Sequence, residues 1–154
     1  MTEAITERRS DRELVVTRTF AATPVALWRA WTEAELFRQW WVPKSFPITL
    51  LSCEIDARTG GGYRLEFANP NGGEPMAFFG TYTTVELHAK LAWTNDETPD
   101  GAVTTVTFTR EGARTVVAVS NLFPTKEACD EEIQGGAADG LPESLTQLAD
   151  FLTA

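Results

Sequence analysis

Few residues of this chain have the chemistry and spacing of a catalytic centre. His88 is the single histidine, and it falls in a predicted turn between two strands, where a solvated side chain fits better than a general base. No Ser-His-Asp or Cys-His-Asn triad can be built unless that histidine enters a pocket. The sequence therefore predicts no catalytic residue, no metal ligands and no cofactor.

The two cysteines support the same interpretation. Cys53 lies in a strand-like run and Cys129 in a helix-like one, with no CxxC pattern and no histidine nearby. In a chain without an export signal we expect two buried or half-buried thiols rather than a disulfide.

Aromatic residues give a clearer signal than titratable ones. Residues 13–20 are rich in β-branched side chains and predict a strand, and Thr23 and Pro24 then provide a cap and first turn for a helix. Thr32 and Glu35 have capping-box spacing, which predicts a second short helix ending before Pro43.

Trp40 and Trp41 close this segment. Because adjacent residues at a helix end cannot both point inward, we expect one to pack in the core and the other to lie at a cavity rim or on the surface.

From residue 48 onward the hydrophobic period becomes that of strands, with turns rich in glycine, proline and asparagine. Tyr63, Leu65 and Phe67 share one strand face, and Arg64 and Glu66 share the other, which we interpret as solvated. Six further strands are expected, over residues 48–55, 63–68, 76–87, 90–95, 103–110 and 114–122.

The C-terminal part returns to a helical pattern. Residues 125–134 have helical composition, and an apolar stripe follows after Pro142. An antiparallel sheet with one apolar face needs a cover, and this stripe supplies it. The predicted fold is α+β in the order β-αα-ββββββ-α, a curved seven-stranded antiparallel sheet around a long C-terminal helix. The stripe consists of Leu141, Leu145, Leu148 and Leu152.

Length and charge limit the remaining possibilities. The chain has 154 residues, which suits a single domain at residues 13–153 after a flexible tail at residues 1–12. The net charge of −9 argues against nucleic acid as a partner. No apolar run is long enough to span a bilayer, so a cytoplasmic location is expected. Open sheet edges and a spare tryptophan allow a homodimer.

Large rings on the inner face of a curved sheet often leave a cavity beside the covering helix. Tyr82 is of special interest because an inward hydroxyl must find a partner or be offered to a ligand, and Gly80, on the same face, leaves room beside it. The residues predicted to line a ligand cavity are Trp41, Tyr63, Phe67, Phe79, Tyr82, Trp93, Phe108, Leu145 and Leu148.

The order and spacing of these features resemble those of a known family. Its marks here are the Arg18 to Trp28 segment with Trp40-Trp41 and Pro43, the Asp56-Ala-Arg58-Thr-Gly60-Gly61 turn, and Gly140 before the leucine stripe. Over residues 13–153 the chain resembles the activator of Hsp90 ATPase homologue-like (AHSA1-like) proteins of the SRPBCC/START/Bet v 1 helix-grip superfamily. One departure is Leu141, where relatives often have tryptophan.

The resemblance implies a helix-grip fold with a cavity, and it leaves three functions open. The first is non-catalytic binding of a small, mostly hydrophobic molecule between the sheet and the C-terminal helix. The second is a cyclase, dehydratase or hydrolase that uses Tyr82 with an acidic residue such as Glu66. The third is stimulation of an Hsp90-type chaperone ATPase.

Overall fold

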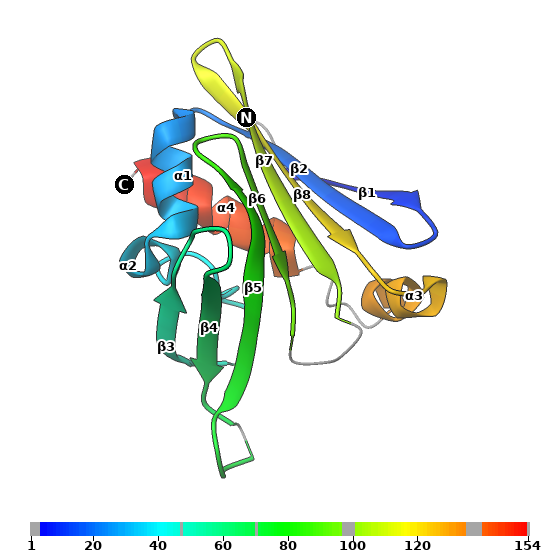
Figure 1. Cartoon of the computed structure of the whole chain (residues 1–154). Coiled ribbons are helices and arrows are strands. Elements are labelled where there is room, and N and C mark those ends of the chain that lie inside the picture. Colours follow the sequence, from blue (N-terminus) through cyan, green and yellow to red (C-terminus); the bar gives the residue numbers. More distant parts are fainter. Residues whose placement is uncertain (1–3, 47, 70, 97–100, 135–139, 154) are drawn as a thin grey trace.

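An antiparallel sheet wraps around the C-terminal helix in the computed structural model of the chain (Figure 1). The structure describes residues 4–46, 48–69, 71–96, 101–134 and 140–153. Within these residues the elements are β1 (Ile5–Ser10), β2 (Glu13–Phe20), α1 (Pro24–Thr32), α2 (Ala34–Phe37), β3 (Leu50–Ile55), β4 (Gly62–Phe67), β5 (Met76–Glu86), β6 (Lys90–Thr94), β7 (Val103–Glu111), β8 (Arg114–Leu122), α3 (Lys126–Gln134) and α4 (Gly140–Thr153).

The predicted α+β architecture is confirmed, but the described sheet has eight strands rather than seven. Their order is β1-β2-β8-β7-β6-β5-β4-β3, and every neighbouring pair is antiparallel. The additional strand is β1, which lies in the stretch assigned to a flexible tail. All six of its side chains are exposed, so it carries no alternating hydrophobic signal. Its backbone pairing with β2, from Ile5 opposite Thr17 onward, holds it at the sheet edge.

The first helix begins as its sequence predicts, but the second does not. The Thr23 hydroxyl accepts a hydrogen bond from the Ala26 amide at 3.2 Å, which caps α1. The predicted capping box at Thr32 is wrong, because the Thr32 hydroxyl donates to the Trp28 carbonyl one turn earlier. Glu33 is the N-cap of α2 and makes no capping bond with its side chain.

The leucine stripe of α4 packs on the inner face of the sheet as predicted. Leu145 and Leu148 are completely buried in the core, which also contains Trp31, Val106 and Val117. Each such leucine contributes about 1.5–3 kcal/mol by leaving water. α4 is therefore fixed to the sheet through the middle of its length.

Gly80 allows β5 to approach the residues around it closely. A Cβ atom built at this position would lie 1.7 Å from the Thr94 carbonyl oxygen and 2.6 Å from Cε2 of Tyr63. Gly80 and Tyr63 are paired across β5 and β4. The missing side chain is what lets the Tyr63 ring lie over the strand.

We expect Gly80→Ala to lower the free energy of unfolding by about 3 kcal/mol or more, because the methyl group overlaps backbone as well as a ring. Urea unfolding followed by tryptophan fluorescence measures this loss. Thr83→Ser is the matched control at an exposed position of the same strand, because it keeps the hydroxyl that donates to the Ala92 carbonyl, and it should change stability by no more than about 0.5 kcal/mol. Equal stability of the two variants would contradict the close approach.

Candidate functional site

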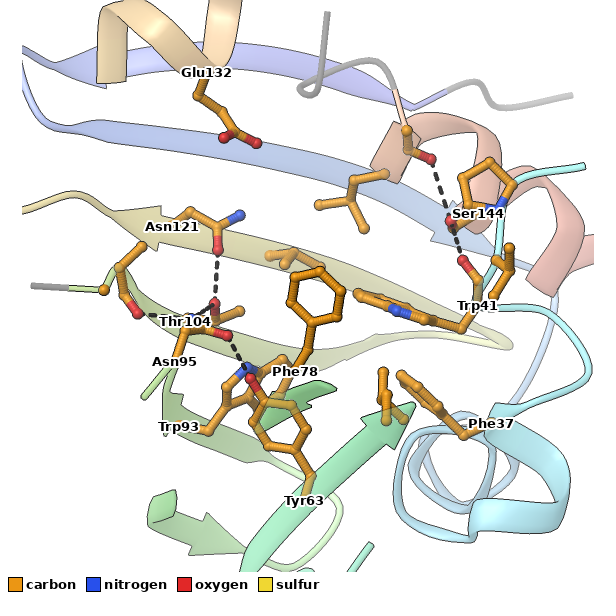
Figure 2. A pocket seen from close by; sticks show the side chains of 18 of the residues that line it. Phe37, Trp41, Tyr63, Phe78, Trp93, Asn95, Thr104, Asn121, Glu132 and Ser144 are labelled. Atoms are coloured by element: carbon orange, nitrogen blue, oxygen red, sulfur yellow. Dashed lines mark hydrogen bonds between the residues drawn. The ribbon is translucent and has the colours of Figure 1, made fainter. Parts of the chain in front are cut away.

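A cavity of about 820 Å³ lies between the inner face of the sheet, the segment after α2, α3 and the first turns of α4 (Figure 2). The cavity exists because α4 packs against the sheet through its middle and not through its N-terminal end. Gly140, Leu141 and Ser144 line the cavity, whereas Leu145 and Leu148 pack against the sheet. The N-terminal end of α4 thus borders the cavity, whereas the middle of α4 is packed tightly against the sheet.

Five of the nine predicted lining residues do line this cavity. The strand faces bring them there, because the inward period of β4 and β5 points their rings to one side. Trp41 lies on the wall and its neighbour Trp40 is 1% exposed in the core, which confirms the expected division of that pair. The five residues are Trp41, Tyr63, Phe67, Tyr82 and Trp93.

Phe79 was wrongly placed in the cavity, where Phe78 lies instead. Phe78, Gly80 and Tyr82 share one face of β5 because side chains alternate along a strand. Phe79 is on the opposite face, with the Arg64 guanidinium carbon 5.7 Å from its ring centroid. The spacing from Tyr82 was sufficient to make this distinction.

Phe108, Leu145 and Leu148 point inward as expected but do not line the cavity. They are 5%, 0% and 0% exposed. The Phe108 ring packs edge-on against Trp28, with centroids 5.6 Å apart. These three side chains belong to the solid part of the core.

One side of the cavity is aromatic. The rings of Phe37 and Trp41 are stacked with centroids 4.8 Å apart. Trp93 lies edge-on to both Tyr63 and Tyr82, at 6.1 Å and 5.9 Å between ring centroids. Such edge-to-face arrangements fix ring positions, so this side offers a defined apolar surface.

A chain of hydrogen bonds that the sequence analysis missed begins at one of these rings. The Tyr63 hydroxyl donates to Oδ1 of Asn95 at 2.6 Å, and Nδ2 of Asn95 donates to the Ala102 carbonyl and to Oγ1 of Thr104. Thr104 donates in turn to Oδ1 of Asn121 at 2.7 Å. Strand parity could have found these residues. Asn95 is two positions after Trp93, and Thr104 is two before Val106.

Several donors at this cavity lack a partner within the described residues. Nε1 of Trp31 is buried without a hydrogen bond, and Nδ2 of Asn121 and the hydroxyl of Tyr82 form none. Burial raises the pKa of the Tyr82 phenol well above its ordinary value, so the hydroxyl stays protonated and available as a donor.

Two carboxylates from α3 complete the lining. Glu131 and Glu132 both border the cavity, and Figure 2 shows the Glu132 carboxylate extending toward the side that holds Asn121. Burial raises the pKa of Glu132 above its ordinary value, because removal from water disfavours the charged form.

The acid–base pair considered from the sequence is not assembled. Glu66 lies on the outer face of β4, where its carboxylate is 3.0 Å from Nε of Arg64, whereas Tyr82 faces the cavity. His88 occupies the turn between β5 and β6 with a φ of 61°, its ring edge-on to Trp28. Neither Glu66 nor His88 is part of the cavity lining.

Cys53 and Cys129 are free thiols, half-buried and buried respectively, as predicted. Among the described residues no group of three or more histidine, cysteine, aspartate or glutamate side chains could hold a metal ion. No helix within the same residues is long and apolar enough to cross a membrane.

Polar side chains of α4 hold the segment after α2 in place over the cavity. Gln147 donates to the carbonyls of Trp40 and Val42 and accepts from the Lys44 amide, each at 2.8 Å. Ser144 donates to the Trp41 carbonyl. These bonds fix the backbone that carries Trp41.

A carboxylate makes a further contact at the same place. Glu143 accepts hydrogen bonds from both the amide and the hydroxyl of Ser45. These bonds lower the pKa of Glu143 below its ordinary value, because they stabilise the ionised form.

Comparison with known proteins identifies relatives of the whole domain. The model of the Activator of Hsp90 ATPase homolog 1-like protein family matches residues 21–153. No curated protein matches the chain at sequence level.

Solved structures of bacterial proteins have the same fold. A crystal structure from Rhodobacter sphaeroides has a TM-score of 0.87 at 23% identity, covering 98% of each chain. One from Nitrosomonas europaea has a TM-score of 0.84 at 23% identity, covering 95% of this chain and 97% of that one. The solution structure of an AHSA1-like protein from Aeromonas hydrophila has a TM-score of 0.64 at 22% identity, covering 89% and 94%. At these identities the likeness concerns the fold.

We expect Gln147→Leu to release the segment over the cavity. The variant leaves two carbonyls and one amide without their partner, which costs about 2–3 kcal/mol for three ordinary hydrogen bonds. Hydrogen exchange should show loss of protection at the Lys44 amide while the β7–β8 ladder stays protected. Gln39→Leu, an exposed glutamine on the preceding turn, is the control. Unchanged exchange at Lys44 would contradict the role of Gln147.

The Ser45–Glu143 contact should depend on pH. Because the pKa of Glu143 is lowered in the fold, its contribution to stability is present above the ordinary carboxyl pKa and is lost as the pH falls through the folded value. NMR titration should place the Glu143 midpoint below 4.5. Ser45→Ala should move it back toward that value, and a midpoint that does not respond to Ser45→Ala would exclude this contact as the cause.

Proposed function

Because this chain belongs to the family of Activator of Hsp90 ATPase homolog 1-like proteins, we propose that it binds a small, mostly hydrophobic molecule in the cavity between its sheet and α4. The observation that carries the proposal is the cavity itself, whose volume of about 820 Å³ falls in the range of about 300–1,000 Å³ typical of ligand sites.

The composition of the wall supports binding rather than catalysis. Stacked and edge-on rings make up much of the wall, and a chain of amide and hydroxyl groups adjoins them. Such a wall takes an apolar body and orients it through a few polar groups. The cyclase, dehydratase or hydrolase alternative loses its specified pair, since Tyr82 and Glu66 lie on opposite faces of the sheet.

The remaining parts of the hypothesis stay predictions. Stimulation of a chaperone ATPase depends on a contact between two proteins and not on this cavity. A cytoplasmic location, a homodimer and a single domain over residues 13–153 are likewise expected from the sequence. Native mass spectrometry of freshly purified protein would report a copurified ligand and the subunit count together.

The neutral fluorescent probe N-phenyl-1-naphthylamine tests the proposal directly. We expect its emission to rise on binding, and Ala128→Trp to weaken binding at least about tenfold, because an indole added on α3 occupies cavity volume that the ligand needs. Fluorescence titration gives the dissociation constants, and circular dichroism checks that the variant is folded.

Gln134→Trp is the matched control, because it adds the same side chain to an exposed position of α3. It should bind the probe like the unmodified protein. Absence of any emission rise with the unmodified protein, or equal affinity in Ala128→Trp, would refute the proposal.

A further inference from the structure

The charged groups of the cavity all have one sign. Its described lining contains the carboxylates of Glu131 and Glu132 and no lysine, arginine or histidine. The residues outside the described ranges add no basic side chain, since none of them is lysine, arginine or histidine. With a net charge of −9 for the chain, the potential in the cavity favours a cation over an anion.

Glu132 has no counter-ion. Within the described residues its carboxylate forms no ion pair and no hydrogen bond. Glu132 also lines a second, small hollow, and the other residues around that hollow are uncharged. They are Thr6, Leu14, Val16, Asn121, Phe123 and Leu141. The half-buried carboxylate is thus held among groups that do not neutralise it.

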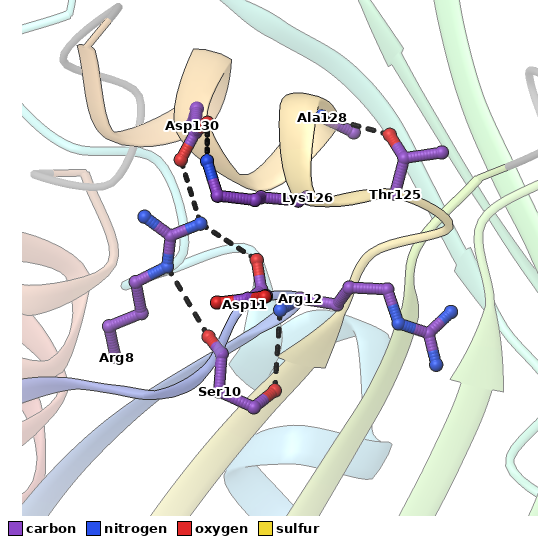
Figure 3. A network of polar contacts seen from close by, with 8 residues as sticks. All are labelled: Arg8, Ser10, Asp11, Arg12, Thr125, Lys126, Ala128 and Asp130. Carbon is purple, nitrogen blue, oxygen red and sulfur yellow. Dashed lines mark hydrogen bonds and ion pairs between the residues drawn. The ribbon is translucent and has the colours of Figure 1, made fainter.

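Two basic side chains beside α3 are engaged by another carboxylate of that helix (Figure 3). Arg8 and Lys126 both pair with Asp130, at 2.7 Å and 3.0 Å, and Arg8 also donates to the Asp11 carbonyl. Positions two apart on a helix point to different sides. Asp130 therefore pairs with both cations on the side of α3 that faces β1, whereas Glu132 lies on the side that faces the cavity.

Polar groups beside Glu132 suit a protonated amine. Oδ1 of Asn121 accepts one hydrogen bond, from Thr104, and a carbonyl oxygen has a second lone pair. Asn121 and Glu132 border the same small hollow. A primary ammonium has three donors, and a carboxylate and an amide oxygen can each accept one of them. The rings of Phe37 and Trp41 on the opposite side have no such acceptor and suit an apolar body (Figure 2).

We infer that the ligand is an amphipathic amine, a mostly apolar molecule whose single protonated nitrogen lies against Glu132 and Asn121 and whose apolar body lies against Phe37 and Trp41. This inference rests on the proposed function, and it specifies the chemical class of the ligand.

Three probes with one apolar frame test it: 2-(1-naphthyl)ethylamine, 2-(1-naphthyl)ethanol and 1-naphthylacetate, which are cationic, neutral and anionic at pH 7. Calorimetric titration should show the amine binding at least about tenfold more tightly than the alcohol, with the acetate weakest. In Glu132→Gln the amine should lose its advantage, so that the amine and the alcohol bind within about threefold of each other.

Thermal unfolding without ligand gives a second readout. Because Glu132 is half-buried without a partner among the described residues, Glu132→Gln should raise the unfolding midpoint at pH 7 by about 1–3 °C. A residue needed only for structure would lower it. Glu127→Gln removes the same charge from an exposed position of α3, and this control should preserve the preference for the amine.

The two hypotheses fail in different ways. Equal binding of the amine and the alcohol, or a preference that survives Glu132→Gln, would overturn the inference and leave the binding function intact. If none of the three probes binds, both are overturned.

Discussion

The burial of Leu145 and Leu148 against the sheet is the contact on which the rest of the structure depends. It fixes α4 through its middle, and α4 in turn holds the backbone after α2 through Ser144 and Gln147. That backbone carries Trp41 to the cavity wall. Two apolar side chains that do not line the cavity thus position it. The sequence predicted Leu145 and Leu148 as lining residues, but they act by holding α4 against the sheet.

Strand periodicity made most of the fold and several residues of the cavity wall predictable. It assigned the inward faces of β4 and β6 correctly, and with them Tyr63, Phe67 and Trp93. The same rule applied strictly would have replaced Phe79 with Phe78 and added Asn95, Thr104 and Asn121. These residues were missed because polar side chains on an inward face look like exceptions in a hydrophobic pattern, although here they form one connected chain of hydrogen bonds.

Other differences lie where local sequence carries little information. β1 is fully exposed and is held by backbone pairing alone, so no side-chain pattern announces it. The capping box at Thr32 was a valid local pattern, but the hydroxyl bonds to the preceding turn instead. The carboxylates of α3 looked like the wet side of a helix, because the sequence does not reveal that this helix lies across the open end of a cavity.

The arrangement of the cavity is costly to the protein when it is empty. A hollow forgoes dispersion contacts, and a half-buried carboxylate without a counter-ion is poorly solvated. Among the residues that the structure describes, the donors of Asn121 and Tyr82 also lack acceptors. These costs are compatible with an ordinary stability of about 5–15 kcal/mol only because the core around Leu145 and Leu148 is tightly packed. A leucine at position 132 would remove the cost of the poorly solvated carboxylate without changing the fold. The Glu132 carboxylate borders a cavity whose described lining has no basic side chain, while Asp130 on the same helix pairs with Arg8 and Lys126. Because the cations pair with Asp130, the charge of Glu132 stays unbalanced and can attract a cationic ligand.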